Sequence, residues 1–185
     1  MKLIDKEYVE NNQKEIIKAI QDGLVFIYPT DTIYGIGTNA TKDDFVMKIR
    51  TIKQRETKPF SVIAPNIDWI KENCETDKET EKWLEKLPGR YTLFLDLKNT
   101  DCISDEVNPL DDSIGVRIPQ HWFTEIIEKS GIPFITTSAN ISGQSYMRKI
   151  EDLDEDIKNS VDYIIYEGEK IGKESEKVDL RKNLD

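Results

Sequence analysis

The chain has 185 residues, carries a formal net charge of −10 and is 34% charged, which suits a globular domain with a hydrophobic core. The longest apolar runs are about five residues, such as residues 24–28, and the first residues lack the apolar block of a signal peptide. We therefore expect a cytoplasmic protein without a membrane partner. The net negative charge argues against a protein that binds nucleic acid over its whole surface, because an acidic surface repels polyanions.

The first half of the chain predicts helices that alternate with strands. Isoleucines at helical spacing predict a helix over residues 8–22, and the apolar run 24–28, closed by Pro29, predicts a buried strand. A second helix is expected from Asp43 to residues 53–55. The further expected elements are a strand over 60–64, two helices within 67–87, strands over 93–97 and 114–118, a helix beginning near residue 123, a strand over 133–137, a helix over 149–160 and a strand over 163–166.

This order of elements predicts the α/β class. No helix is expected between the strands over 93–97 and 114–118, so the sheet should mix parallel and antiparallel pairs. No repeat or low-complexity block divides the chain. We therefore expect a single domain over residues 1–185, with its motifs between residues 14 and 180 and a charged C-terminal tail.

A cluster of cations interrupts this acidic chain. From Lys48 to Lys58 there are five cations and one acid. A solvated helix face is the ordinary explanation for such a run. Within it, Lys53-x-Arg55 lies where a helix gives way to a loop. An arginine fork suits bidentate phosphate binding and a lysine adds a point charge, so the cluster also fits a phosphate site.

Two polar strings follow apolar runs, which is where open α/β sheets place ligand sites. Residues 30–37 are Thr-Asp-Thr-Ile-Tyr-Gly-Ile-Gly, and residues 138–143 are Ser-Ala-Asn-Ile-Ser-Gly. Their hydroxyls and amides can bond one ligand, whereas turns stabilised by their own side chains are the structural alternative. The Gly35-x-Gly37 match to the dinucleotide fingerprint is weak, because it does not directly follow a strand and no acidic residue closes a second strand.

Arg117 lies inside an apolar strand, so it needs an anionic partner, which a ligand or one of the chain's many carboxylates could supply. His121 is the only histidine, which excludes a histidine metal cluster, and we expect it at a helix start. No Gly-x-Ser-x-Gly elbow accompanies it, which argues against Ser-His-Asp chemistry. Cys74 and Cys102 lack metal-type spacing and are expected as reduced thiols.

Taken together, six strings resemble, in this order, the YrdC/TsaC family of threonylcarbamoyl-AMP synthases, over roughly residues 14–180. The strings are residues 28–37, 53–55, 88–92, 115–119, 138–143 and 175–179. The resemblance implies a single YrdC-like domain, in which a twisted mixed sheet is flanked by helices and carries an open concave ligand cleft.

The resemblance also implies an enzyme, a nucleotidyltransferase that converts L-threonine, bicarbonate or CO2, and ATP into L-threonylcarbamoyladenylate and pyrophosphate. This is the first step in forming threonylcarbamoyladenosine in tRNA. A separate tRNA threonylcarbamoyl transferase is the implied downstream partner, and tRNA itself is not a required partner. Mg²⁺ is expected to arrive with ATP, without a dedicated metal site.

Residue roles follow from the same resemblance. The implied catalytic residues are Lys53 and Arg55, which would hold the phosphates and stabilise the departing pyrophosphate. The residues implied to bind ATP are Lys53, Arg55, Lys58, Ser113 and Asn140. The residues implied to bind threonine are Thr32, Arg117, Ser138 and Ser175.

Two positions depart from the family pattern. Arg90 stands in place of the second proline of Pro-Gly-Pro-x-Thr, and Glu176 in place of the threonine of Ser-Thr-Val-Val-Asp. Two other functions stay open. One is a carbamoyl-adenylate-forming relative, as in hydrogenase maturation, although its acylphosphatase-like and zinc-binding segments have no counterpart here. The other is a non-catalytic RNA-binding module that uses the cations from Lys48 to Lys58, against which the net charge counts.

Overall fold

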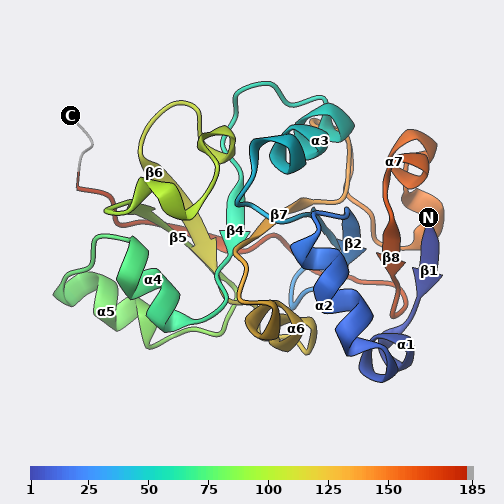
Figure 1. The fold of residues 1–185 in the computed structure, drawn as a ribbon, viewed down its shortest axis with the longest axis horizontal. Coiled ribbons are helices and arrows are strands. Elements are labelled where there is room, and N and C mark those ends of the chain that lie inside the picture. Colours follow the sequence, from blue (N-terminus) through green and yellow to red (C-terminus); the bar gives the residue numbers. More distant parts are fainter. Residues whose placement is uncertain (183–185) are drawn as a thin grey trace.

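Nine strands form one sheet within residues 1–182, the part of the chain that the computed structural model describes (Figure 1). Their order across the sheet is β1-β8-β2-β3-β7-β4-β6-β5-β9. The strands are β1 Lys2–Ile4, β2 Phe26–Tyr28, β3 Gly35–Gly37, β4 Ser61–Ile63, β5 Tyr91–Asp96, β6 Ser113–Arg117, β7 Phe134–Ser138, β8 Tyr163–Ile165 and β9 Glu176–Asp179. The end of the predicted C-terminal tail, residues 183–185, lies outside the described residues.

The sheet is mixed, as predicted. β8 runs parallel to both β1 and β2, β4 is parallel to β6, and β5 is parallel to β9. The pairs β2–β3, β3–β7, β7–β4 and β5–β6 are antiparallel. The antiparallel β5–β6 pair is the one for which no intervening helix was expected, since a parallel crossover would need such a helix.

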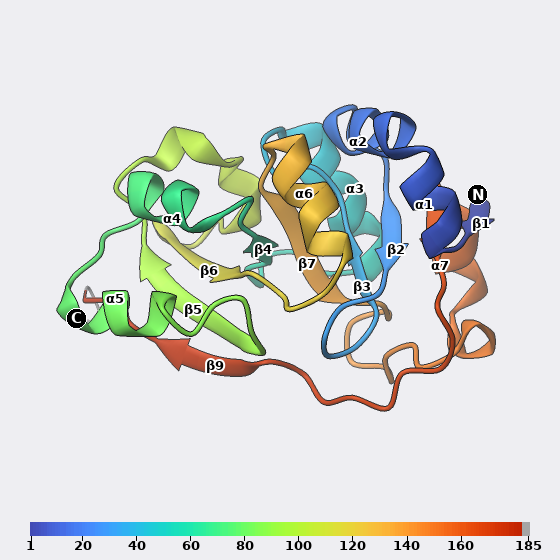
Figure 2. The same ribbon diagram turned by 90° about the horizontal axis from the view of Figure 1, so that it is seen from below.

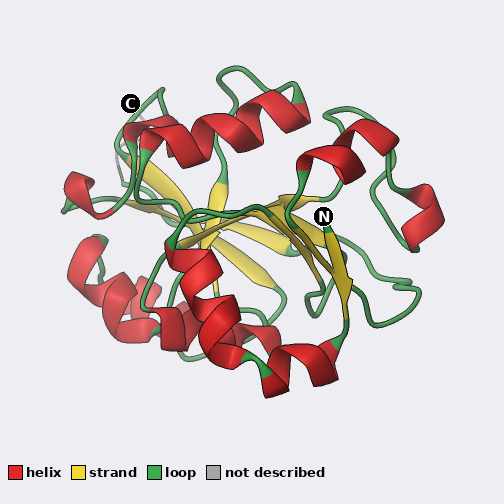
Figure 3. Cartoon of the chain, turned by 45° about the vertical axis from the view of Figure 1, so that its right-hand side comes forward, coloured by secondary structure: helices red, strands yellow, loops and turns green. Residues whose placement is uncertain are grey.

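Helices cover both faces of this sheet (Figure 3). They are α1 Lys6–Asn11, α2 Gln13–Gln21, α3 Asp43–Lys53, α4 Ile67–Asn73, α5 Lys78–Leu84, α6 Phe123–Ser130 and α7 Glu155–Ser160. The helices α2 and α6 share one apolar cluster with Phe26 and Phe134 of the sheet. The helices α3, α4 and α7 share a second cluster with Ile27, Ile36 and Val62. None of the helices within residues 1–182 is long and apolar enough to cross a membrane.

Most expected elements are present, and the differences have local causes. The expected helix over 8–22 is two helices, because Asn12 leaves helical geometry with φ −124° and ψ 33°, and its side-chain Nδ2 donates to the carbonyl oxygen of Tyr8 at 2.8 Å. The expected helix over 149–160 is a 3-10 turn at Ile150–Asp152 followed by α7. Sequence patterns do not predict β1, β3 or β9. Each is only three or four residues long, and two of the three residues of β3 are glycines.

One face of the sheet changes from apolar to polar along its central strands. On β7, Phe134 packs in the cluster beneath α2 and α6, and the two-residue alternation places Thr136 and Ser138 on the same side of the sheet. On β4, Ile63 and Ser61 show the same change. The helices cover the apolar end of this face, and the side chains at its polar end line a cavity.

We predict that Gly37 tolerates no side chain. A Cβ atom at Gly37 would lie 1.9 Å from the carbonyl oxygen of Ile135, which is main chain and cannot move without disturbing β7. Gly37→Ala should therefore lower the free energy of unfolding by about 3 kcal/mol or more, measured by urea denaturation. Gly131→Ala is the matched comparison. It meets no atom within 4 Å but has a φ of +68°, so it should cost only about 1 kcal/mol. Equal losses in the two variants would contradict the prediction.

Candidate functional site

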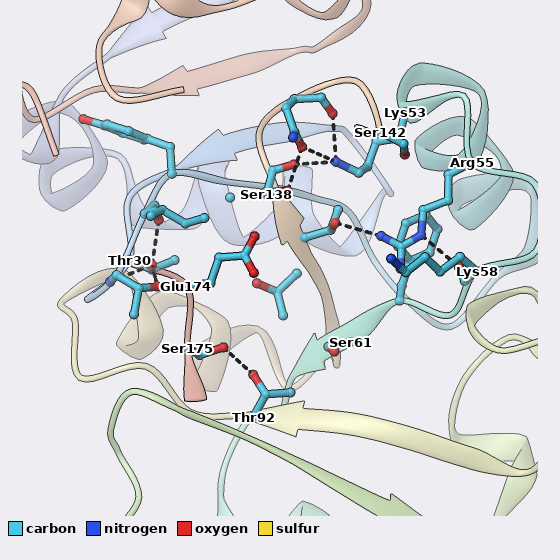
Figure 4. A pocket seen from close by; sticks show the side chains of 18 of the residues that line it. Thr30, Lys53, Arg55, Lys58, Ser61, Thr92, Ser138, Ser142, Glu174 and Ser175 are labelled. Carbon is cyan, nitrogen blue, oxygen red and sulfur yellow. Dashed lines mark hydrogen bonds between the residues drawn. The ribbon is translucent and has the colours of Figure 1, made fainter. Parts of the chain in front are cut away.

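A cavity of about 400 Å³ opens above the polar end of the sheet (Figure 4). It collects every residue that sequence analysis selected, except Ser113. The selected residues that line it are Thr32, Lys53, Arg55, Lys58, Arg117, Ser138, Asn140 and Ser175. These residues come from five separate segments of the chain, which the sheet order brings to one place.

Short polar side chains form the floor of this cavity. Ser61 of β4 lies opposite Thr136 of β7 in the antiparallel register and opposite Gly115 of β6 in the parallel register. Arg117 is two residues beyond Gly115 and shares its face. A Cβ atom at Gly115 would lie 2.4 Å from Oγ of Ser61, so glycine is needed to keep the floor open.

Lys53 joins the end of α3 to the loop that follows β7. Its side chain is buried, and Nζ donates to the carbonyl oxygens of Ser138 (2.5 Å) and Asn140 (2.8 Å) and to Oδ1 of Asn140 (2.9 Å). Its own carbonyl oxygen accepts from the N–H of Ser142 at 3.1 Å. All three protons of the ammonium group are thus used by protein oxygens, so Lys53 fixes the loop that carries Asn140 and Ser142.

Two opposing influences act on the charge of Lys53. Burial, and then the neighbouring charge of Arg55, lower the pKa of its ammonium group to about 7, although the charge of Glu174 acts in the opposite direction. The three oxygens around Nζ favour the protonated form, because a neutral amine would offer only two donors. They therefore limit how far the pKa falls.

Arg55 is folded back onto its own loop. Nε donates to the carbonyl oxygen of Lys58 at 2.9 Å, Nη2 donates to the carbonyl oxygen of Pro59, and Nη1 lies 3.4 Å from Oγ1 of Thr137. Burial, and then the charge of Arg50, lower the pKa of Arg55 to about 10. The guanidinium group remains charged at neutral pH and lines the cavity.

Arg50 organises the same loop from beneath, a role that sequence analysis did not assign. Its buried guanidinium donates to the carbonyl oxygens of Glu106 (2.6 and 3.0 Å), Arg55 (3.1 Å) and Glu56 (2.8 Å). Both guanidinium groups lie against the ring of Phe60, whose centroid is 4.8 Å from Cζ of Arg50 and 4.7 Å from Cζ of Arg55. This stack sets where Arg55 stands in the cavity wall.

Arg117 has an anionic partner within the protein. Nη2 lies 2.6 Å from Oδ1 of Asp31, and both side chains are buried. Oδ2 of Asp31 also accepts from the N–H of Gln120 at 3.0 Å. Both terminal nitrogens of Arg117 lie 3.4 Å from Oγ1 of Thr32. Nε of Arg117 is buried and has no hydrogen-bond partner among the described residues.

Hydroxyl and amide groups around the cavity are already paired with one another. Oγ of Ser138 donates to Oδ1 of Asn140 at 2.6 Å, and Oγ1 of Thr32 lies 3.0 Å from Oγ1 of Thr30. These bonds hold Ser138 and Asn140 in place before any ligand arrives.

A long segment of irregular chain, residues 166–175, runs past the cavity from β8 to β9, and we call it the strap (Figure 2). Oη of Tyr34 donates to the carbonyl oxygen of Gly168 at 2.7 Å, and Oη of Tyr146 donates to that of Gly172 at 3.1 Å. At its end, Oγ of Ser175 lies 2.7 Å from Oγ1 of Thr92. The strap thereby supplies one wall of the cavity.

Ser113 is the selected residue that the structure does not bring to this cavity. It begins β6, four residues before Arg117, which places it about 13 Å farther along the strand. Its Oγ accepts from Nδ2 of Asn108 at 3.2 Å, and its N–H donates to Oδ1 of Asp111 at 3.0 Å. Ser113 therefore belongs to a local turn, and the implied contact with a nucleotide stays a prediction.

Sequence analysis missed several cavity residues for different reasons. Ser61 and Thr136 are polar residues within otherwise apolar strands, and this signal is as visible in the sequence as that of Arg117. Glu174 lies among many charged residues near the C-terminus, and no local pattern distinguishes it from a solvated surface. Lys177 lies inside the string 175–179, but the family pattern has valine at this position and so predicts no cation there.

The family model named Sua5/YciO/YrdC, which carries the description "Telomere recombination", matches residues 18–184. The chain belongs to this family. The resemblance drawn from the six strings is confirmed by this match.

Known relatives cover most of the chain. A Methanocaldococcus jannaschii protein, whose name assigns it provisionally to the threonylcarbamoyl-AMP synthases, is 36% identical over 165 residues, which are 86% of this chain and 77% of that protein. A Vibrio campbellii protein named threonylcarbamoyl-AMP synthase is 28% identical over 168 residues, 88% of this chain and 89% of its own.

Among solved structures, P. abyssi Sua5 complexed with L-threonine superposes with a TM-score of 0.84 at 26% identity. The match covers 97% of this chain and 54% of the P. abyssi chain. The chain thus spans about half the length of that solved relative.

We predict that Lys53 makes stability rise with pH. The unfolded chain keeps the Lys53 proton up to the ordinary pKa of 10.5, and the folded chain only up to about 7. Between these values the unfolded state binds more protons, so the free energy of unfolding increases with pH. Urea denaturation at pH 7 and pH 9 should show this increase in the wild-type chain and a smaller one in Lys53→Met. Lys48→Met, at an exposed position on the same helix, should follow the wild type. An equal increase in the free energy of unfolding between pH 7 and pH 9 in all three proteins would contradict the prediction.

Proposed function

We propose that this chain is a threonylcarbamoyl-AMP synthase, which forms L-threonylcarbamoyladenylate and pyrophosphate from L-threonine, bicarbonate or CO2, and ATP. One observation carries the proposal. A single cavity has the cations Arg55 and Lys58 in one wall and the buried Arg117 in another. The same fold is found in relatives that bear this name and in a solved structure complexed with L-threonine.

The phosphate groups of ATP would lie against the wall formed by the α3–β4 loop. Lys58 is exposed and has no ion pair among the described residues, so its ammonium group is available to a phosphate. Arg55 adds a fixed positive charge, and Lys53 holds Asn140 in position through Oδ1. These groups would neutralise the charge that develops on the departing pyrophosphate.

Threonine would lie toward Arg117, with Thr32, Ser138 and Ser175 around it. Its amine captures CO2 to give a carbamate, and a carbamate oxygen attacks the α-phosphorus of ATP as pyrophosphate leaves. This step requires positioning and charge neutralisation more than a strong protein base.

Mg²⁺ would enter with ATP. Within residues 1–182 no cluster of three His, Cys, Asp or Glu side chains is arranged to hold a metal ion, and most groups that line the cavity are hydroxyls and cations. This set of side chains fits a metal that is held by phosphate oxygens and water. When bound, the ion would supply positive charge at the phosphates.

The product would serve the first step of threonylcarbamoyladenosine formation in tRNA. A mixed anhydride of this kind needs a second protein to transfer the threonylcarbamoyl group to tRNA, and we propose such a transferase as the downstream partner. Direct binding of tRNA is not required for the synthase step. We retain the cytoplasm as the proposed location.

The deciding experiment is pyrophosphate release from ATP, Mg²⁺ and bicarbonate, with and without L-threonine. Release should depend on threonine. Arg117→Lys should raise the KM for threonine roughly tenfold or more, because lysine cannot replace the guanidinium fork, with little change in the KM for ATP. Lys58→Ala should raise the KM for ATP, with little change in the KM for threonine. Lys48→Ala, outside the cavity, is the matched control. Release that needs carbamoyl phosphate in place of threonine and bicarbonate would identify a carbamoyl-adenylate-forming relative.

Serine should be a poor substrate rather than an inactive one. It differs from threonine by one methyl group, and a small apolar pocket discriminates by roughly 10–200-fold for such a group. The ratio of kcat/KM for the two amino acids, measured by the same pyrophosphate assay, should fall in this range. Equal turnover of serine and threonine would argue against the assignment.

A further inference from the structure

Glu174 is the only carboxylate among the described residues that line the cavity. The other charged groups there are cations: Lys53, Arg55, Lys58, Arg117 and Lys177. Figure 4 shows the Glu174 side chain pointing into the cavity rather than away from it. Within residues 1–182 its carboxylate takes part in no hydrogen bond and no ion pair, although its charge acts on that of Lys53. Its oxygens are therefore free to accept bonds from a ligand.

The main chain on both sides of Glu174 is held in place. Two residues before it, the carbonyl oxygen of Gly172 accepts from Oη of Tyr146 at 3.1 Å. Directly after it, Ser175 is bonded to Thr92, and the N–H of Glu176 donates to the carbonyl oxygen of Arg90 at 2.9 Å. A carboxylate on such a fixed segment can position a ligand.

A carboxylate in a cavity that binds phosphates needs a cation as its partner, because it would repel the phosphates themselves. Two cations belong to the proposed reaction: the α-ammonium group of threonine and Mg²⁺. The position of Glu174 in the fold decides between them.

The two residues that hold the main chain around Glu174, Gly172 and Ser175, both lie near Arg117. The register Leu93↔Val116 places Thr92, the partner of Ser175, next to Arg117. On the other side, Gly172 lies so close to Thr32 that a Cβ atom on the glycine would be 1.8 Å from the carbonyl oxygen of Thr32. The loop that carries Arg55 and Lys58 belongs to a different part of the cavity wall.

An α-amino acid carries its carboxylate and its ammonium group on one carbon, so the two groups that bind them must be neighbours. Arg117 fits the carboxylate. We propose that Glu174 is a threonine-binding residue, whose carboxylate accepts hydrogen bonds from the α-ammonium group of the substrate. This inference rests on the proposed function and adds a residue that the family resemblance did not assign.

Calorimetric titration with L-threonine tests the proposal in three proteins: the wild type, Glu174→Gln and Glu176→Gln. Glutamine keeps the shape of Glu174 and removes its charge. We expect Glu174→Gln to weaken threonine binding by about tenfold or more, as the loss of a charge-assisted hydrogen bond does. Glu176 is two residues farther along, exposed and outside the cavity, so Glu176→Gln should bind threonine within about twofold of the wild type.

Two further measurements separate a specific contact from other causes. The hydroxy acid in which a hydroxyl replaces the amine of threonine should bind the wild type and Glu174→Gln with equal affinity. The Mg²⁺ concentration that gives half-maximal pyrophosphate release should also be the same in both proteins.

Several outcomes would overturn the proposal. They are unchanged threonine binding in Glu174→Gln, an equal loss for the hydroxy acid, or a rise in the Mg²⁺ requirement that matches the loss of threonine binding. If the wild type itself fails to bind threonine, both the proposed function and this inference are wrong. If the wild type binds threonine and Glu174→Gln binds it equally well, the inference fails alone.

Discussion

The ammonium group of Lys53 holds two segments of the chain together at three oxygen atoms, and the cationic side of the cavity is arranged from this point. Through Lys53, the end of α3 is fixed to the loop after β7 that carries Asn140. The residues that follow Lys53 then turn into the loop of Arg55, which Arg50 supports from beneath. A buried ammonium group costs free energy unless its donors are satisfied, and here the protein satisfies all three. Lys53 therefore contributes geometry to the site as well as charge.

The contrast between the whole chain and its cavity explains how an acidic protein can hold a polyanionic ligand. The net charge of the chain is −10, whereas the described residues that line the cavity include five cations and one carboxylate. Their charges act within a partly enclosed space, where solvent and salt screen them less than at the exposed surface. Attraction for phosphate is thus local. The acidic remainder of the molecule disfavours long nucleic acids without weakening the binding of one nucleotide.

The sequence predicted the mixed α/β fold and eight of the residues that line the cavity, because apolar runs and polar strings are local features of the chain. Apolar runs mark the strands, and polar strings at their ends mark the site. Ser113 lies on the strand that carries Arg117 but does not line the cavity, so its implied contact with a nucleotide stays a prediction. Arg50 and Glu174 show the limit of such patterns. Arg50 contacts Glu106, far along the chain, and Glu174 reaches the cavity only because the sheet brings distant segments together, and no spacing in the sequence records either arrangement.

The position of β8 in the sheet has a consequence for how the chain folds. This strand lies between β1 and β2, although residues 163–165 are made long after residues 26–28. Until β8 arrives, β2 has an open edge, and its three residues, Phe26, Ile27 and Tyr28, are all fully buried in the finished fold. Contacts so distant in sequence form slowly, and an apolar strand with an unpaired edge invites pairing with another molecule. The partly folded chain is therefore exposed to aggregation at β2, and insertion of β8 ends that exposure.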